Sequence, residues 1–472
     1  MIRACGRPVA VALLALLAGA YALRVALIAG GGQWFWADES RYLQALDAVR
    51  LFAAGDAPGA WHAVAGTADH LGFKVIALVP AAVQHALGLG LGAAAAMLAL
   101  ASVLDILLVF LIARRAGADG VEALGAAFAM ACSNAMFYWS RHLMPYDLAM
   151  AFALAALLAG LRPGARGAGF LPAGALGFAA FATYNGYWTL VAVAFALPVI
   201  AGLPDVREAA RRAALLAAGF ALAGAAVVLA VRGIVGADVI ASWRGFATTV
   251  HQGDFDDGHG VVLGYLWDAE RLLALAWLAA AAVLALAALR GAKVDRRAWW
   301  WLGCALGVLA ALVAGSNFAG QFVVYGRLTR QAIPFLSLLL AYVLFGPWRH
   351  RAPARWRVPA GALALAAIAA SNFAAPLRLT FPAEFVARGR ALVAAQGGVP
   401  PAVDATSGRY RFVNAKFMWP MPEPSGVPQG ARELLRAPHP LGFAPYLYEG
   451  FDRAQRTAYR DADLTMRLVA VE

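Results

Sequence analysis

Two adjacent carboxylates, Asp38 and Glu39, are the first residues of the chain whose types suggest chemistry. They follow the aromatic stretch 34–36, directly after the first long apolar run. A carboxylate in such a position can act as a general base and take a proton from a hydroxyl group. In a simpler interpretation, residues 34–36 form an aromatic belt at a membrane interface, and the two acids begin a helix whose positive end favours them.

A second polar segment, residues 140–147, combines a cation, an imidazole and an acid: Arg141, His142 and Asp147. The cation suits an anionic ligand, and the acid can orient a hydroxyl group. Pro145 marks the start of a new helix, so Asp147 could also be an ordinary charge in a first helical turn. Taken alone, this segment is a weak indication of a site.

A third polar segment contains Tyr325, Arg327 and Arg330 and leads through Pro334 into another apolar run. Guanidinium groups at the mouth of an apolar bundle bind phosphate well, because they donate charge-assisted hydrogen bonds. The alternative is that both arginines snorkel to lipid headgroups.

Apolar helices must position these segments. The chain has 472 residues, of which 62% are hydrophobic and 14% are charged, whereas a soluble domain is roughly 25% charged. The apolar runs are long enough to cross ~30 Å of hydrocarbon at about 1.5 Å per residue. Because each span must satisfy its backbone hydrogen bonds within lipid, the sequence predicts an all-α polytopic membrane bundle.

We expect eleven transmembrane helices. They lie near Val9 to Ile28, Ala94 to Ile112, Val121 to Trp139, Tyr146 to Leu161, Gly167 to Phe181, Tyr187 to Leu203, Ala213 to Val231, Leu272 to Leu289, Trp299 to Ala314, Arg330 to Phe345 and Val358 to Phe373. The start of the chain could alternatively be a signal peptide ending at Ala18-Gly19-Ala20, although its apolar run continues beyond that point.

The basic residues predict the orientation, because Lys and Arg in short loops are retained on the cytoplasmic side. They occupy alternate loops: Arg3 and Arg7; Arg114 and Arg115; Arg162 and Arg166; Arg207, Arg211 and Arg212; Arg290, Lys293, Arg296 and Arg297; Arg349, Arg351, Arg355 and Arg357. The N-terminus is then cytoplasmic, and the C-terminus and all three polar segments are external. The net charge of +12 therefore reflects topology and does not indicate a nucleic-acid partner.

The apolar stretch Leu71 to Leu89 is an exception to the pattern. If it crossed the membrane, every later basic cluster would lie outside. We therefore predict an interfacial or re-entrant helix on the external side, broken by Pro80 and carrying Lys74, within an external loop at about residues 30–93.

Beyond Phe373 the composition changes to one rich in proline and charge. We assign residues 1–375 to the transmembrane bundle and residues 376–472 to a small external segment of mixed α/β structure, which ends in a strand over Met466 to Val471.

Two further features stay open. Asp105 lies in the middle of the second span, where a charge costs roughly 2.5 to 3.5 kcal/mol, and it is either functional or paired. The loop His251 to His259 is rich in carboxylate and imidazole groups, so it leaves room for a divalent cation. Its spacing fits no defined ligand pattern, which favours a solvated acidic loop, and we predict no other metal or cofactor site.

The three polar segments, in this order and on this side, resemble the GT-C superfamily of membrane glycosyltransferases, in particular the branch of the protein O-mannosyltransferases and the aminoarabinose transferase of lipid A. In that branch an Asp-Glu pair follows the first span, an acid closes a Ser-Arg type segment two spans later, and an arginine-containing segment with a proline opens a late helix. The matching residues are Asp38-Glu39 with Tyr42, Ser140-Arg141 with Asp147, and Arg327 to Pro334. The resemblance covers the bundle to about Phe373.

The segment between the first two spans fits this branch in part. The family places juxtamembrane helices there, which is where the basic residues place Leu71 to Leu89. Its members often carry a Pro-Pro pair with a basic residue before that helix, but this chain has Asp69-His70-Leu71-Gly72-Phe73-Lys74. Whether Lys74 corresponds to the family's basic residue therefore stays open.

The resemblance implies an inverting transfer of a sugar from a polyprenyl-phosphate donor to a hydroxyl of a lipid, glycan or protein acceptor, on the external face. It implies Asp38 as the base, with Glu39 and Asp147 beside it. The residues expected to bind the donor phosphate are Arg141, Lys74, Arg327 and Arg330, and the other cavity candidates are Tyr42, His142 and Tyr325. The abundance of Ala, Gly and Arg is associated with bacteria of high genomic GC content, which indicates the bacterial inner membrane.

A lipid-linked sugar flippase or transporter is the alternative function. Such a protein shares the apolar bundle and the anion-binding arginines, but places polar residues or broken helices at the bilayer midplane, often in paired repeats. The sequence has no convincing internal repeat, and apart from Asp105 its acids gather outside the spans.

Overall fold

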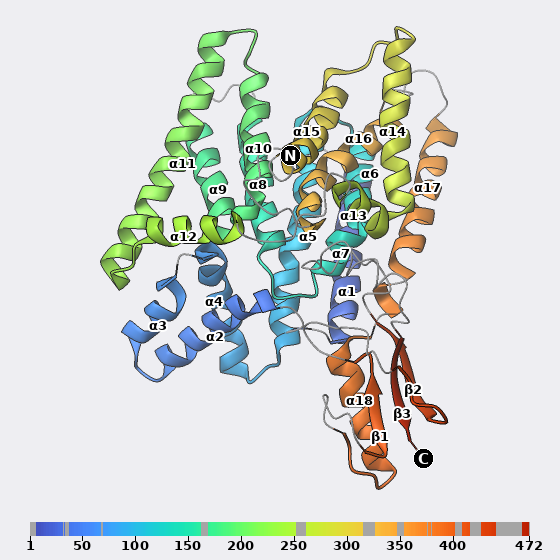
Figure 1. Ribbon diagram of the computed structural model, residues 1–472. Coiled ribbons are helices and arrows are strands. Elements are labelled where there is room, and N and C mark those ends of the chain that lie inside the picture. Colours follow the sequence, from blue (N-terminus) through green and yellow to red (C-terminus); the bar gives the residue numbers. More distant parts are fainter. Residues whose placement is uncertain are drawn as a thin grey trace.

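The computed structural model describes residues 6–31, 33, 37–67, 69–161, 169–251, 261–314, 326–346, 354–374, 376–378, 380–401, 408–415, 426–439 and 465–471. In these residues the chain is mostly helical, with a small sheet near its C-terminal end (Figure 1). Several residues named above lie outside the described residues: the aromatic stretch 34–36, residues 252–260 of the acidic loop, Tyr325, and five of the basic loop residues, Arg3, Arg162, Arg166, Arg349 and Arg351.

Apolar helices form the bundle. They are α1 (Arg7–Ala29), α5 (Leu91–Arg115), α6 (Gly120–Ala131), α7 (Asn134–Trp139), α8 (Tyr146–Gly160), α9 (Phe170–Thr183), α10 (Trp188–Ile200), α11 (Val206–Val235), α14 (Leu272–Leu289), α15 (Arg296–Val313), α16 (Ile333–Phe345) and α17 (Ala354–Ala374). Shorter elements join them: η3 (Asn185–Tyr187), α12 (Val239–His251), α13 (Val261–Glu270) and η5 (Gly326–Ala332).

Within the described residues, five helical stretches are long and apolar enough to cross a membrane. They are Arg7–Ala29, Leu91–Arg115, Val206–Val235, Leu272–Leu289 and Arg327–Phe345. Several other apolar helices, α6 and α8 among them, are shorter than the about 20 residues that a span needs. The membrane character of the chain is therefore evident, and the expected number of eleven spans stays a prediction.

The expected third span, Val121 to Trp139, is two helices. α6 closes at Cys132, and Ser133 begins α7 as its N-cap, with its hydroxyl accepting a hydrogen bond from the Met136 amide at 3.3 Å. A serine at this position satisfies a backbone donor that the start of a helix leaves open. The prediction of one continuous helix was wrong here, because a serine N-cap is hard to see within an apolar run.

Three helices precede the second apolar span: α2 (Ser40–Ala53), α3 (Ala57–Ala65) and α4 (Leu71–Leu87). α4 occupies the stretch expected to lie at the interface, and it runs through Pro80 without a break, contrary to the prediction. A proline removes one backbone hydrogen bond, but the buried face of α4, with Phe73, Ala77 and Ala81, continues on both sides of it and belongs to one apolar cluster with residues of α2 and α5.

Figure 1 shows the arrangement along the bundle. The connections between α10 and α11 and between α14 and α15 lie at the upper end, whereas α2, α3, α4, α18 (Pro382–Ala395) and the sheet lie at the lower end. The basic residues beside those two connections, such as Arg211 and Arg290, therefore share one end of the molecule.

The C-terminal part has its own small core. The strands β1 (Tyr410–Val413), β2 (Arg432–Pro438) and β3 (Thr465–Ala470) form an antiparallel sheet in the order β1-β3-β2. Phe385 of α18 packs with Phe412 and Leu468 of the sheet in a separate apolar cluster. The predicted mixture of helix and strand, with a strand near the end of the chain, is confirmed.

Candidate functional site

An ion pair joins the first and third polar segments. Asp38 lies in η2 (Ala37–Glu39), directly before α2, and its Oδ2 is 3.4 Å from Nη2 of Arg327 in η5. Its other oxygen, Oδ1, is 2.8 Å from Nη1 of Arg41, one helical turn later. The Asp38 side chain is 33% exposed, while that of Arg327 is 5% exposed. The carboxylate is thus held by two cations and still open on one side.

A second ion pair joins the second and third segments. Asp147, in the first turn of α8, contacts Nη2 of the fully buried Arg330. The ring of Tyr146 contacts both arginines, with its centroid 5.6 Å from the guanidinium carbon of each. Burial strengthens the electrostatic attraction between the charged groups, because little water screens them, and the aromatic ring adds a favourable contact with each cation. Arg330 is therefore not at the lipid surface, and Asp147 is more than an isolated helix-terminal charge.

Glu39 joins the first segment to the second. Its Oε1 accepts a hydrogen bond from the Leu143 amide at 2.8 Å and lies 3.6 Å from Nδ1 of His142, and its side chain is fully buried. Glu39 occupies the N-cap position of α2 without capping that helix through its side chain. The interpretation of Glu39 as a simple helix cap is therefore wrong, and its carboxylate holds the two segments together.

The network extends from Asp38 through residues that were absent from the predicted site. Arg41, which bonds Asp38, also bonds Oδ2 of Asp69 through Nε at 2.8 Å. The other oxygen of Asp69 contacts Nδ1 of His70. The pairing of Asp38 and Arg41 could have been found from their spacing of three residues on one helical turn. The bond to Asp69 could not, because it depends on how α4 packs beside α2.

Charge around Asp38 sets its protonation. Burial by itself would raise the pKa of this carboxyl, but the charges of Arg327 and Arg41 outweigh burial and lower the pKa below its ordinary value. Burial, together with the charge of Arg41, lowers the pKa of His70 despite its contact with Asp69. At neutral pH Asp38 is therefore a carboxylate and His70 is an uncharged imidazole.

Gln331 fixes the segment that carries both arginines. Its Oε1 accepts hydrogen bonds from the Thr189 hydroxyl at 2.6 Å and the Leu190 amide at 3.0 Å, and its Nε2 donates to the Gly186 carbonyl at 3.1 Å. η5 is thereby tied to the start of α10. This role of Gln331 is not evident from the sequence, because a glutamine before a span is an ordinary polar flanking residue.

Neither a protein-family model nor a curated protein matches this chain. Its function has to be inferred from the site itself.

Lys74 and Arg141, which were expected to bind phosphate, contact other groups. Nζ of the buried Lys74 donates to the carbonyl and the hydroxyl of Thr67, at 3.0 and 2.9 Å, and burial lowers the pKa of Lys74 to about 8. Arg141 donates to the Gly31 carbonyl and stacks on Phe381, with its guanidinium carbon 3.4 Å from the ring centroid. Lys74 holds the turn before α4, and Arg141 lies against Phe381, the residue directly before α18.

The remaining cavity candidates in the described residues are buried. The Tyr42 hydroxyl donates to Oε1 of Gln84 at 2.6 Å and so ties α2 to α4. His142 packs among the rings of Tyr138, Trp139 and Phe381, and burial lowers the pKa of this imidazole. Both side chains therefore contribute packing and hydrogen bonding around the polar segments.

Two acids and two arginines thus meet from three distant segments. Within the part of the chain that the structure describes, there is no group of three or more His, Cys, Asp or Glu residues placed to hold a metal ion. The chemistry that this arrangement can perform is proton transfer by a carboxylate beside a fixed positive charge.

Proposed function

We propose that the chain is a membrane glycosyltransferase that moves a sugar from a polyprenyl-phosphate donor to an acceptor hydroxyl. The observation that carries the proposal is the contact of Asp38 with Arg327, at 3.4 Å, beside the pair of Asp147 and Arg330. It places a partly exposed carboxylate, suited to be a base, against a buried guanidinium, suited to bind a leaving phosphate.

The reaction is a single displacement at C1 of the sugar. Asp38 accepts the proton of the acceptor hydroxyl as its oxygen attacks C1. The bond from C1 to the phosphate oxygen breaks, its electron pair leaves with polyprenyl phosphate, and the anomeric centre is inverted. Arg327 stabilises the charge that develops on the leaving phosphate. Asp147 keeps Arg330 in place beside Arg327.

The ion pair has a role before catalysis. While Arg327 is bound to Asp38, it lowers the basicity of that carboxylate. A donor phosphate that binds Arg327 draws the guanidinium away from Asp38, so the carboxylate becomes a better proton acceptor once the donor is in place. Binding of the donor therefore activates Asp38 as the base.

The location proposed is the bacterial inner membrane, with the N-terminus cytoplasmic and the site on the external face. Support comes from the loops beside Arg211 and Arg290, which lie at the end of the bundle opposite α2, α3 and α4 (Figure 1). Positive loops are retained in the cytoplasm. A lipid-linked donor would reach the site from the outer leaflet.

One observation favours a lipid-linked sugar transporter instead. Arg24 of α1 and Asp105 of α5 are buried within helices long enough to span a membrane, and Nε of Arg24 donates to the Ser102 hydroxyl at 2.9 Å. Charged groups inside spans are typical of substrate or ion paths in transporters. Asp147 and Arg330 both act electrostatically on these two ionisable groups.

A single assay separates the two functions. The purified protein in liposomes is given a polyprenyl-phosphate hexose labelled in the sugar, together with hydroxyl acceptors extracted from the cell envelope. The transferase releases polyprenyl phosphate and moves the label to an acceptor, whereas a transporter moves the intact lipid between leaflets. Leaflet exchange without release of polyprenyl phosphate would refute the proposal. Mass spectrometry of envelope glycans and glycolipids from strains with and without the gene then identifies the acceptor.

A further inference from the structure

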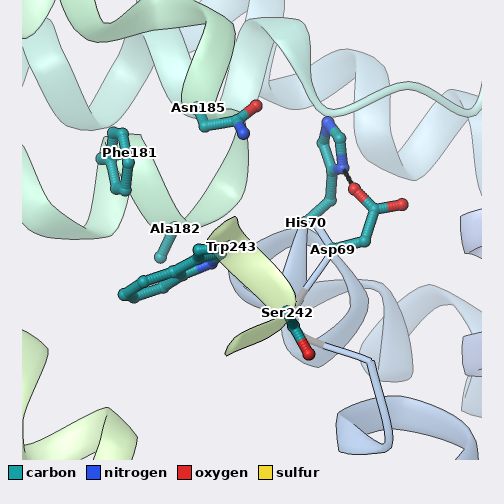
Figure 2. Close-up of a pocket in the computed structure, with 7 residues that line it drawn as sticks. All are labelled: Asp69, His70, Phe181, Ala182, Asn185, Ser242 and Trp243. Atoms are coloured by element: carbon teal, nitrogen blue, oxygen red, sulfur yellow. Dashed lines mark hydrogen bonds and ion pairs between the residues drawn. The ribbon is translucent and has the colours of Figure 1, made fainter. Parts of the chain in front are cut away.

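Two distant parts of the chain pack near the segment that carries the proposed base. On the side of α4, Asp69 and His70 line a small pocket together with residues of α9, η3 and α12 (Figure 2). This pocket has room for about one water molecule, so it is too small for a substrate. The second part is the C-terminal segment, which meets the bundle at Phe381, and its contacts lead to the base.

Phe381 is the contact point of the C-terminal segment. It lies directly before α18 and is fully buried. Its ring stacks on Arg141, with the guanidinium carbon 3.4 Å from the ring centroid. The rings of His142 and Tyr138 pack beside it, with centroids 5.9 and 6.2 Å away. One side chain of the C-terminal segment therefore packs against the stretch 138–142, which includes the start of the second polar segment.

Arg141 links Phe381 to the end of α1. Its Nη2 donates to the Gly31 carbonyl, and its own backbone carbonyl accepts a hydrogen bond from Nε2 of Gln33 at 3.4 Å. The same Gln33 nitrogen donates to the Ile28 carbonyl at 3.1 Å. The end of α1, from which the chain continues to the proposed base, is therefore tied to Arg141.

His142 and Leu143 hold the chain on the other side of the base. Glu39, the neighbour of Asp38, accepts a hydrogen bond from the Leu143 amide at 2.8 Å and lies 3.6 Å from Nδ1 of His142. The side chains of Glu39 and His142 are both buried, so little water competes for these contacts. Asp38 therefore lies between two anchored points of the chain, and residues 141–143 hold both.

The stacking of Phe381 on Arg141 has a chemical requirement. A flat guanidinium is attracted to the face of an aromatic ring, and the attraction is stronger where water is excluded. Both residues are fully buried. Phe381→Leu would fill much of the space without attracting the cation, and Arg141→Lys would keep the charge without the flat surface. An ordinary apolar contact would tolerate both changes, whereas this contact should not.

We propose that Phe381 is a positioning residue: by holding Arg141 and His142, it keeps Asp38 in place against Arg327. The C-terminal segment is then a functional part of the transferase and not merely a domain attached to it. The inference rests on the proposed function, and it adds a residue that touches neither the donor nor the acceptor.

The kinetics of sugar transfer test this role. Phe381→Leu should lower kcat about tenfold and leave KM for the donor nearly unchanged, because neither Phe381 nor Arg141 contacts the donor in this scheme. Arg141→Lys should have the same effect from the other side of the contact, and Phe381→Tyr, which keeps the ring, should lose clearly less. The matched control is Phe385→Leu on α18. Phe385 is also fully buried but packs against Phe412, so its variant should match wild type in kcat.

The acid limb of kcat/KM gives a readout that a general loss of stability would not change. Burial raises the pKa of Asp38, whereas the charges of Arg327 and Arg41 outweigh burial and lower it. If Asp38 moves away from Arg327, this pKa rises. The acid limb should therefore shift to higher pH in Phe381→Leu and stay in place in Phe385→Leu.

Hydrogen–deuterium exchange followed by mass spectrometry tests the contact without any reaction. In detergent, the amides of residues 37–46 should exchange about tenfold faster in Phe381→Leu than in wild type. In Phe385→Leu, faster exchange should be confined to the C-terminal segment. Because Phe381→Leu and Arg141→Lys change different elements, one of them can fail to fold without ending the test.

The two experiments separate failure of the inference from failure of the proposed function. Faster exchange of residues 37–46 in Phe381→Leu, together with no sugar transfer by the wild type, would support the contact and overturn the transferase. Transfer that depends on Asp38, together with an unchanged kcat, acid limb and exchange rate in Phe381→Leu and Arg141→Lys, would overturn the positioning role alone.

Discussion

At the scale of single residues, the candidate site consists of two ion pairs, Asp38 with Arg327 and Asp147 with Arg330. All four residues stood out in the sequence, because a charge beside an apolar run needs a reason. Arg141 stood out for the same reason, but it stacks on Phe381. The partners could not be predicted, because residues separated by 289 positions, such as Asp38 and Arg327, meet only through the packing of the whole bundle.

The pH dependence of transfer should reveal the ion pair of Asp38. The pKa of this carboxyl lies below its ordinary value of about 3.9 in the free protein, so the base stays charged as pH falls through the acidic range and is lost only below that value. Donor phosphate on Arg327 should move the pKa upward. We expect the acid limb of kcat/KM, which reports the free protein, to lie at lower pH than that of kcat. An acid limb of kcat/KM near pH 6 would contradict this account.

Removing the partner of Arg330 should destabilise the protein. Asp147→Asn leaves a fully buried guanidinium without its carboxylate, and breaking a buried pair in this way costs about 3 to 5 kcal/mol. Thermal unfolding in detergent measures the loss. The double variant Asp147→Asn with Arg330→Gln should recover much of it, because no uncompensated charge remains. Equal stability of Asp147→Asn and wild type would show that the pair does not hold the site together.

At the scale of elements, a buried acid explains why one apolar run forms two helices. Glu270, at the end of α13, accepts hydrogen bonds from the Ser133 hydroxyl at 2.6 Å and from the Asn134 and Ala135 amides at 2.8 and 2.9 Å. Asn372 of α17 donates to it at 3.2 Å. The backbone amides at the start of α7 thus donate to the carboxylate of a residue 135 positions away in the sequence. Hydropathy could not reveal such a break, because the residues at the break are not charged.

Glu270→Gln tests this role. The amide keeps the shape but loses the charge, and its NH₂ group can face the donors of α7. Hydrogen bonds to charged groups contribute about 1.5 to 3 kcal/mol each, so unfolding in detergent should occur at a clearly lower temperature. The matched control is Glu208→Gln on α11, which removes only surface ion pairs, worth about 0 to 1 kcal/mol. Similar small losses in both variants would argue against Glu270 as the link.

The position of α4 relative to the membrane is open to a direct test. With 17 residues, α4 is shorter than the about 20 that a span needs, and α5 follows it with Arg114 and Arg115 in its last turn. A reporter fused after Leu89 should behave as external and one fused after Arg115 as cytoplasmic. If the fusion after Leu89 is cytoplasmic, α4 crosses the membrane and the predicted orientation of everything after it is reversed.

At the scale of the whole molecule, composition predicted a helical membrane protein, whereas hydropathy predicted longer and more continuous helices than the structure has. A chain with 62% hydrophobic and 14% charged residues has to be a helical membrane bundle. Helices such as α6 and α8 have only 12 and 15 residues, so their lengths do not fix the number of spans. α2, α3, α12 and α13 were not predicted as helices, because short segments carry too little periodic pattern.

The fold as a whole places the three polar segments together. η2 leads into α2, the second segment joins α7 to α8, and η5 opens α16, so each lies at a junction of helices. The order of the segments and their predicted side were sufficient to propose that they meet. Their contacts were not predictable, since they depend on Gln331, Glu39 and Glu270, whose roles are purely tertiary.

The most direct test of the proposed mechanism compares Asp38→Asn with Asp47→Asn in purified protein. Asp47 lies on the exposed face of α2, where it pairs with Arg50, so its variant controls for loss of an acid from that region. Sugar transfer from a polyprenyl-phosphate donor is measured in detergent, with donor binding and thermal stability measured on the same samples. Asp38→Asn should lose roughly 10²- to 10⁴-fold of the transfer rate while still binding donor, and Asp47→Asn should match wild type. Near-normal transfer by Asp38→Asn would contradict the mechanism.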